Sequence, residues 1–405
     1  MARNMRTWRR ALLSLACALT LALAGCTPSG LGRGGPSAAL PPPPSGGIES
    51  APLPANGGPD RIGTGPVKIA LIAPLTGSSA VGLSLRNAAE LAVAAFDSAD
   101  VSVLVKDDQS SPAGARAAAQ AAIAEGAELI VGPLFAANVR EVGAVARAAG
   151  RPVIAFSTDP AAAGRGVYLL SFLVESYVDR VVDYAVARGK RSMAALIPNT
   201  DYGRLAEAAF IAAAARNNIR VMAVERLQPG AAPAAAQKIA ALGAQIDALF
   251  IAEQAEAMAG LSQSLAAAGI DGEKVQILGT GLWNDARVLK IAALKGAWFA
   301  APDNAGFASF ALSYRHRFGA DPSRVATLAY DAVALAAALA RQPPAERYAE
   351  KMLQGESGFN GTDGLFRFRP DGLNERGLSV QMIDNGSTTR ISQTPRSFGA
   401  PPSGI

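Results

Sequence analysis

The stretch Val67-Lys68-Ile69-Ala70-Leu71-Ile72-Ala73 is a short run of mostly apolar residues that predicts a buried β-strand. Apolar residues then recur at helical spacing from Leu85 to Phe96, which predicts a helix. A near-continuous apolar strand followed by a helix is typical of a parallel sheet whose two faces are covered by helices. The stretch therefore predicts that the fold begins with a strand–helix unit of an α/β protein.

Strand–helix units of this kind recur along the chain. Ala113 to Glu125 predicts a helix, with Ser111 as its N-cap and Pro112 as its first residue. Further apolar runs predict strands at residues 101–105, 129–131, 153–156, 193–197, 219–224, 248–251 and 275–278. These units predict an α/β fold with two Rossmann-like lobes that contain parallel sheets.

The composition disfavours most catalytic and metal-dependent functions. His316 is the only histidine, and its neighbouring arginines predict a surface position on a helix. Cys17 and Cys26 are the only cysteines, which leaves too few ligands for a zinc cluster and no histidine-based catalytic dyad. We therefore predict no catalytic residue, no metal site and no cofactor. Lysine and arginine are not clustered with aromatic residues, so no nucleic-acid partner is predicted.

Residues 1–25 have the features of a bacterial lipoprotein signal peptide. Four arginines precede an apolar run, Ala11–Leu23, that is too short for a stable membrane span. Small residues then precede Cys26, whose thiol would carry the lipid and become the new N-terminus. The alternative is an ordinary cleaved signal with a chance cysteine. Beyond this segment the chain is nearly neutral, with 34 basic against 33 acidic residues, so its charge identifies no partner.

Two segments outside the lobes are expected to be loose. Residues 26–65 are dense in Pro, Gly and Ser and predict a disordered tether. Residues 386–405 predict a loose C-terminal tail. The lipid on Cys26 is the only membrane attachment that we predict, because no other apolar run is long enough to span a membrane.

Three loops that follow predicted strands carry candidate ligand-binding residues. Thr76 lies in a turn of glycines and hydroxyl residues after the first strand, where open α/β sheets bind ligands; an ordinary connection is the alternative. Gly132 and Pro133 follow a later strand, and Ser157 and Thr158 follow the next. Free backbone N–H groups and hydroxyls at these places suit a ligand carboxylate. Ser-Thr-Asp before Pro is also good turn chemistry.

Asp107 and Asp108 form an adjacent carboxylate pair at the end of a predicted strand. Adjacent residues of a strand point to opposite faces, so we do not expect a catalytic acid–base pair. We predict instead a strand end that lies in solvent.

The order of several motifs resembles that of one protein family. The motifs are Ile72–Gly77, Asp107–Ser110, Val131–Leu134, Asp201–Arg204 and Phe359–Phe368 with Asp371 and Gly372. In this order and spacing they resemble the leucine/isoleucine/valine-binding proteins, of the type I periplasmic solute-binding fold, over residues 66–385. The resemblance implies two lobes that are joined by a three-crossing hinge and close on an amino-acid-like ligand.

The resemblance also implies which residues contact that ligand. Thr158 and Tyr202 match family contacts, and the Tyr202 ring would cap the ligand from the second lobe. Glu253 falls in the acidic stretch where the family binds the ligand ammonium group. The chain departs from the family at Ala136 and Ala137, where a hydroxyl commonly contacts the ligand carboxylate. The missing hydrogen bond corresponds to about 1.5–3 kcal/mol when the acceptor is charged.

The resemblance sets the expected limits of the two lobes. The first is expected to comprise residues 66–170 and 282–357, and the second residues 171–281 and 358–385. The expected domains are thus a signal peptide, a tether, two discontinuous lobes and a tail.

Two functions are compatible with these features. The first is the solute-binding receptor of an amino-acid ABC uptake system, lipid-anchored and facing the periplasm, with an inner-membrane permease as partner. The alternative is a lipoprotein that activates a bifunctional penicillin-binding protein, since Val153–Asp159 and Gly166–Leu170 look like sequences of such activators. Thr27, in place of an aspartate after Cys26, favours the outer membrane over the inner membrane.

Overall fold

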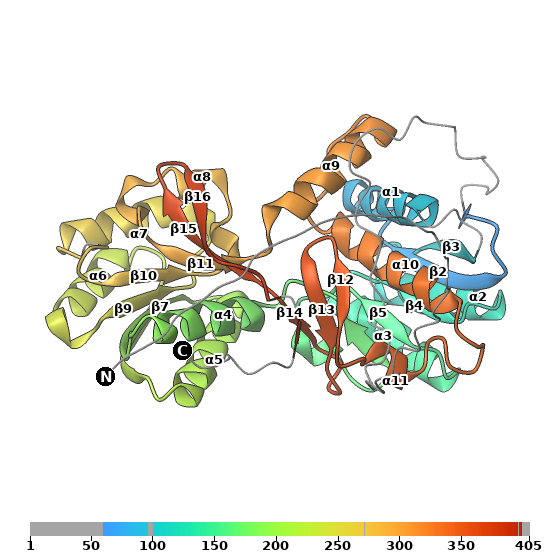
Figure 1. Cartoon of the computed structure of the whole chain (residues 1–405), viewed down its shortest axis with the longest axis horizontal. Helices are drawn as coiled ribbons and strands as arrows, with labels where there is room; N and C mark the ends of the chain where they lie inside the picture. Colours follow the sequence, from blue (N-terminus) through green and yellow to red (C-terminus); the bar gives the residue numbers. More distant parts are fainter. Residues whose placement is uncertain (1–59, 96–99, 271, 396, 399–405) are drawn as a thin grey trace, which may run out of the picture. The chain divides into compact units, whose positions relative to one another are not determined.

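The chain folds into two lobes, each built on its own sheet. The computed structural model describes residues 60–95, 100–270, 272–395, 397 and 398 (Figure 1). The predicted signal peptide, the lipid site Cys26, Thr27 and most of the tether lie outside these residues. The expected α/β fold with two lobes is confirmed, with a six-stranded sheet in one lobe and a seven-stranded sheet in the other.

The sheet of lobe 1 has the strand order β1-β3-β2-β4-β5-β6. Its strands are β1 (Arg61–Ile62), β2 (Val67–Ala73), β3 (Val101–Asp107), β4 (Leu129–Val131), β5 (Val153–Ala155) and β6 (Val167–Leu169). All pairings are parallel except that of β1 with β3. Apolar residues along nearly every strand are needed here, because helices cover both faces.

Alternate side chains of β2 point to opposite faces of this sheet. Ile69 and Leu71 belong to one buried cluster, which includes α1 and α10, whereas Ala70 and Ile72 belong to another, which includes α2 and α3 (Figure 1). The helices of lobe 1 are α1 (Ser79–Ala95), α2 (Pro112–Ala124), α3 (Ala136–Ala148), η1 (Pro160–Ala162), α9 (Asn304–Phe318), α10 (Ala326–Ala340) and α11 (Glu350–Leu353). The predicted cap of α2 is confirmed, since the Ser111 side chain accepts a hydrogen bond from the N–H of Gly114.

The sheet of lobe 2 has the strand order β16-β15-β11-β10-β9-β7-β8. Its strands are β7 (Ser192–Pro198), β8 (Arg220–Leu227), β9 (Ala248–Ile251), β10 (Gln276–Gly279), β11 (Trp298–Ala301), β15 (Ser379–Asp384) and β16 (Ser387–Ser392). β15 and β16 are antiparallel to their neighbours and the remaining pairs are parallel. β11 was not among the predicted strands.

The helices of lobe 2 also lie on both faces of its sheet (Figure 1). They are α4 (Val174–Ala187), α5 (Asp201–Arg216), α6 (Ala232–Ala240), η2 (Gly243–Gln245), α7 (Ala255–Ala267), η3 (Gly281–Trp283), α8 (Ala286–Leu289) and η4 (Ala292–Leu294). Leu249 and Ile251 of β9 pack in the cluster that includes α6 and α7, and Ala248 and Phe250 in the cluster that includes α4 and α5. Among the described residues, no helix is both long enough and apolar enough to cross a membrane.

A small third sheet completes lobe 1. It consists of β12 (Phe359–Gly361), β13 (Gly364–Phe368) and β14 (Asn374–Arg376), all antiparallel. Phe359, Phe366 and Phe368 pack in the same buried cluster as α1 and α10. The stretch 359–368 therefore belongs to lobe 1 and is not itself a crossing between the lobes.

The chain crosses between the lobes three times, at different positions from those expected. The crossings are residues 170–173 between β6 and α4, residues 302–303 between β11 and α9, and residues 377–378 between β14 and β15. The expected limits at 282 and 358 are wrong. Residues 281–301 stay in lobe 2, where Trp283 is fully buried and β11 pairs with β10.

The expectations of a tether up to residue 65 and of a loose tail from residue 386 are wrong at their inner ends. Arg61 and Ile62 pair with β3, and Ser387–Ser392 form the edge strand β16 along β15. Residues beyond β16 then reach lobe 1, because Thr394 lies beside Gly364 and Gly377, and the Arg367 guanidinium lies 4.7 Å from the Phe398 ring centre. Thr394 thus contacts the hinge and lobe 1, and Phe398 contacts lobe 1.

Candidate functional site

A cleft of about 1160 Å³ is lined by residues of both lobes. Thr158, Phe307 and Arg324 line it from lobe 1, whereas Tyr177 and Tyr202 line it from lobe 2. Two residues of the crossings, Phe172 and Pro302, also line it. The cleft therefore contacts two of the three connections about which the lobes can move.

Two of the predicted ligand contacts, Thr158 and Tyr202, line this cleft from opposite lobes. Thr158 is exposed, and no described residue hydrogen-bonds its hydroxyl. The Tyr202 hydroxyl donates to Thr280 Oγ1 at 2.8 Å, and burial raises the pKa of Tyr202 above its ordinary value. Tyr202 is thus held in position as a neutral ring, while the Thr158 hydroxyl is free to bind a ligand.

The other predicted contacts are not among the residues that line the cleft. Gly132, Pro133 and Ser157 are buried. The N–H of Gly132 donates to the carbonyl of Ile154 at 2.7 Å, and Ser157 Oγ accepts from the N–H of Asp159 at 3.1 Å. These three residues shape the loops beneath the cleft.

Thr76 and Glu253 are engaged locally. Thr76 Oγ1 donates to Asp107 Oδ2 at 2.7 Å, and Glu253 Oε1 accepts from the N–H of Gln254 at 2.8 Å. Gln254, the residue after Glu253, lines the cleft in its place.

Asp107 and Asp108 are structural groups, and the prediction that this strand end lies in solvent is wrong for Asp108. Burial tends to raise the pKa of Asp107, but hydrogen bonds from Thr76, Gln109 and other donors hold it below its ordinary value. Asp108 is completely buried, and burial raises its pKa although the Asn138 amide donates to it at 2.9 Å. Asn138 is thereby occupied and is not available to a ligand.

The wall of the cleft near the hinge is aromatic. Phe172, Tyr177, Tyr202 and Phe307 all line it. Burial raises the pKa of Tyr177 to about 12, so its ring carries a neutral hydroxyl at physiological pH. These rings give the cleft flat apolar surfaces of the kind that bind the body of a small organic ligand.

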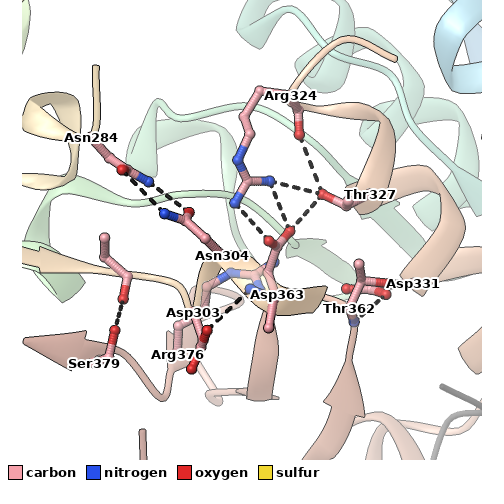
Figure 2. Close-up of polar contacts among 12 residues, drawn as sticks. Asn284, Asp303, Asn304, Arg324, Thr327, Asp331, Thr362, Asp363, Arg376 and Ser379 are labelled. Atoms are coloured by element: carbon pink, nitrogen blue, oxygen red, sulfur yellow. Dashed lines mark hydrogen bonds and ion pairs between the residues drawn. The ribbon is translucent and has the colours of Figure 1, made fainter. Parts of the chain in front are cut away.

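An arginine–aspartate pair lies beside two of these rings, Phe172 and Phe307. Figure 2 shows the hydrogen bonds of the pair. Arg324 donates from Nη2 to Asp363 Oδ1 at 2.6 Å and from Nη1 to Asp363 Oδ2 at 3.0 Å. Asp363 also accepts the hydroxyl of Thr327 at 2.5 Å. The carboxylate is completely buried while the Arg324 side chain is 38 % exposed, so Asp363 positions a guanidinium that still faces the cleft.

A second buried pair of charges lies next to the first. Asp331 accepts from the N–H of Thr362 at 2.8 Å, but its other oxygen has no hydrogen-bond partner among the described residues (Figure 2). Arg376 donates from Nε to the carbonyl of Ser171 at 3.1 Å, and within the described chain its two terminal nitrogens have no partner. Burial, and then the negative charge of Asp363, raise the pKa of Asp331 to about 7.

We predict that stability falls as the pH rises towards 7 because of Asp331. A carboxyl whose pKa is raised in the folded state favours folding when it is protonated, so its contribution is present near pH 4 and is lost as the pH approaches 7. The shift corresponds to at most about 4 kcal/mol. Urea denaturation of the wild type and of Asp331→Asn between pH 4 and pH 8 tests this. The decline should be smaller in the variant, where Asp108 still contributes to it, and an unchanged decline contradicts the assignment.

Sequence reasoning missed the residues of the hinge side of the cleft. Arg324 follows Asp321-Pro322-Ser323 and precedes an alanine-rich helix, with no motif around it. The one available signal was Thr362-Asp363 between two glycines, a polar pair inside a phenylalanine-rich segment. His316 is exposed on α9, as predicted, and lies outside the cleft.

Comparisons with solved structures show the same fold. A branched-chain amino acid ABC transporter protein from Rhodospirillum rubrum has a TM-score of 0.73 and 19 % identity, over 80 % of this chain and 99 % of that one. A substrate-binding protein of an ABC transporter from Desulfitobacterium hafniense has a TM-score of 0.60 and 18 % identity, over 80 % and 99 %. A solute-binding protein from Rhodopseudomonas palustris has a TM-score of 0.56 and 19 % identity, over 81 % and 96 %.

Comparisons at the level of sequence identify the family. A search of curated proteins finds no match. The family model described as periplasmic binding protein matches residues 66–388, which is most of the chain and includes all three crossings. The resemblance inferred from the order of the motifs is thereby confirmed, and the chain belongs to the periplasmic binding protein family.

Proposed function

We propose that the protein is the solute-binding receptor of an ABC uptake system for amino-acid-like compounds, and that a lipid on Cys26 holds it at a membrane facing the periplasm. The cleft carries this proposal, because both lobes line it and three crossings join them. A ligand that contacts Thr158 in lobe 1 and Tyr202 in lobe 2 would stabilise the closed state through contacts that the open state lacks.

The ligands of related structures support a small organic solute. The Desulfitobacterium hafniense protein is in complex with leucine, and the Rhodopseudomonas palustris protein is in complex with 3,4-dihydroxybenzoic acid. The proposed partner is an inner-membrane ABC permease, and no catalytic step is proposed.

We expect ligand binding to raise the melting temperature of the purified protein. A ligand at 100 times its dissociation constant stabilises the native state by about 2.7 kcal/mol. Thermal melts with the common amino acids, their amides and small aromatic acids test this. Tyr202→Ala should weaken binding at least tenfold without unfolding the protein, because the ring lines the cleft and only its inner side packs against the lobe 2 core.

Tyr202→Phe is the matched control, because it keeps the ring and removes only the hydrogen bond to Thr280. It should retain most of the affinity. If Tyr202→Ala loses stability and binding in the same proportion, Tyr202 is a core residue and not a ligand contact. If no compound of the panel changes the melting temperature, the receptor proposal is contradicted.

The activator of a penicillin-binding protein is the second candidate, and Thr27 after Cys26 is the observation that favours it, through outer-membrane sorting. Retention of a purified bifunctional penicillin-binding protein by the immobilised protein would support this candidate. An absence of retention contradicts it.

A further inference from the structure

We propose that the ligand of this cleft carries a carboxylate on an apolar or aromatic body, and that the Nε–Nη2 edge of Arg324 receives the carboxylate. The inference deepens the proposed function and rests on it, because it names the class of solute. It follows from which hydrogen-bond donors of Arg324 are occupied, from what holds the side chain, and from the charges around it.

Arg324 is the positioned cation of the cleft. Only two lysine or arginine side chains of the described residues line the cleft, Arg204 and Arg324. Arg204 is 71 % exposed and pairs with Asp201 at 2.6 Å, as expected of a residue at the rim. Arg324 is held at the hinge side by the buried Asp363. An anion that enters the cleft therefore meets a fixed guanidinium at Arg324.

Two donors of Arg324 remain unused. A guanidinium has five N–H groups in a rigid plane. The two N–H groups on Nη1 donate to Asp363 and Thr327, and one N–H group on Nη2 donates to Asp363. No described residue accepts from Nε or from the second N–H of Nη2. These two N–H groups lie on one edge of the plane and form a second fork, which matches the two oxygens of a carboxylate.

The unused edge faces away from Asp363. In Figure 2, Nε and Nη2 of Arg324 are turned to the side on which Asn284 and Asn304 lie. Both asparagines line the cleft, and the Asn284 amide donates to Asn304 Oδ1 at 2.8 Å between lobe 2 and lobe 1. The fork is thus turned towards side chains of the cleft wall.

The surroundings hold the guanidinium in place. Its central carbon lies 4.5 Å from the Phe172 ring centre and 4.6 Å from that of Phe307. With the two hydrogen bonds to Asp363, these contacts fix the plane before a ligand arrives, which lowers the entropic cost of binding. The same rings, with Tyr177, line the cleft and offer flat surfaces to the body of the ligand.

The charges near Arg324 favour an anion. Arg376, only 6 % exposed, lies 4.8 Å from the centre of the same Phe172 ring, and its terminal nitrogens have no partner among the described residues. Two guanidinium groups thus lie near Asp363 and Asp331. Burial raises the pKa of Asp331 to about 7, so at neutral pH Asp331 carries only part of its negative charge. The two guanidinium groups are thus not fully balanced by the two carboxyl groups when Asp331 is protonated.

The carboxylates that line the cleft are already paired with arginines. Asp159 pairs with Arg140 at 2.5 Å, and Asp201 pairs with Arg204 at 2.6 Å. Neither is left as an unpaired acceptor for an ammonium group. The cleft thus provides a free fork for a carboxylate, whereas its own carboxylates are engaged, so the carboxylate of an amino-acid-like ligand, more than its amine, is the group that the cleft recognises.

Calorimetric titration with matched acids and primary amides tests the inference. The probes are hydrocinnamate and hydrocinnamamide, isocaproate and isocaproamide, and phenylalanine and phenylalaninamide. For the wild type we expect at least one acid to bind at least tenfold more tightly than its amide, and the acids without an amine to bind at least as tightly as phenylalanine. In Arg324→Gln the ratio between acid and amide should fall close to one while the affinity for the amide changes little.

Two further variants make the result specific. Arg315→Gln, the matched control, replaces an exposed arginine that pairs with Asp321 and does not line the cleft, so it should keep the wild-type ratio. Arg324→Lys keeps the charge without the fork and should give an intermediate ratio, and it decides the question if Arg324→Gln does not give a cooperative melt. Preferential binding of acids that survives in both Arg324 variants overturns the inference and leaves the receptor function standing. An absence of binding by every probe also overturns the inference, whereas the thermal melts with the full panel of compounds decide the receptor function.

Discussion

Replacing Asp363 by asparagine is expected to destabilise the protein by about 3–5 kcal/mol, the range for breaking a buried ion pair. The Asp363 carboxylate is completely buried. It accepts hydrogen bonds from both terminal nitrogens of Arg324 and from the hydroxyl of Thr327. An asparagine keeps the shape but loses the charge and one acceptor, so Arg324 is left without its counter-ion beside the second guanidinium, Arg376. Urea denaturation at neutral pH measures the loss.

Asp321→Asn is the matched control. Its carboxylate also pairs with an arginine, Arg315, at 2.6 Å, but its side chain is 75 % exposed. Exposed ion pairs contribute at most about 1 kcal/mol to stability, so this variant should unfold at nearly the same urea concentration as the wild type. Similar losses in the two variants would contradict the view that burial decides the importance of the Asp363 pair.

Gly132→Ala is expected to destabilise the protein by about 3 kcal/mol or more. Gly132 has φ +88°, a conformation that side chains rarely adopt, and a Cβ atom there would lie 2.1 Å from the carbonyl oxygen of Ile72. The backbone strain alone corresponds to about 1–3 kcal/mol, and the overlap forces the ends of β2 and β4 apart. Chemical denaturation of the variant measures the combined effect.

Gly150→Ala separates the two contributions. Gly150 also has a positive φ, +65°, but no heavy atom lies within 4 Å of the position of an added Cβ. The free energy of unfolding of this variant should fall by only about 1 kcal/mol, which is the contribution of backbone strain. If the two variants are destabilised equally, the close approach of β2 to Gly132 does not limit this position.

The sequence predicted the strands that are buried on both faces. β2, β4 and β9 are continuous apolar runs, and their predicted bounds agree with the structure. β16 was missed because its sequence, STTRIS, is polar. An edge strand pairs through its backbone on one side only and needs few apolar side chains, so composition cannot distinguish it from a loose tail.

The lobe limits were less predictable because they depend on contacts that are distant in sequence. Trp283 follows a short loop after β10, which is a reasonable place for the chain to leave the lobe, yet its side chain packs in the lobe 2 core. Likewise, the resemblance placed Phe366 in lobe 2, beyond the limit expected at residue 358, but its ring packs in the lobe 1 core. Hydrophobic pattern shows that such residues are buried without showing in which core.

The candidate site was predictable where a motif marks it. Thr158 and Tyr202 both line the cleft. Thr158 was predicted from the loop that follows a predicted strand and from the family resemblance, and Tyr202 from the resemblance alone. Arg324 and Asp363 are 39 positions apart, and they pair only because the folded chain brings the residues before α10 next to the turn between β12 and β13. No local pattern marks such a pair, because either residue alone is typical of a surface turn.

The interleaving of the two lobes along the chain also constrains the order in which the protein can fold when its N-terminal part becomes available first. The face of the first sheet that carries Ile69 and Leu71 is covered by α10, which becomes available only after β11 of the other lobe. The second sheet, in turn, gains β15 and β16 only when residues 379–392 have become available. Neither lobe can complete its core from a chain that ends before residue 326, so apolar surface stays uncovered until nearly the whole chain is available.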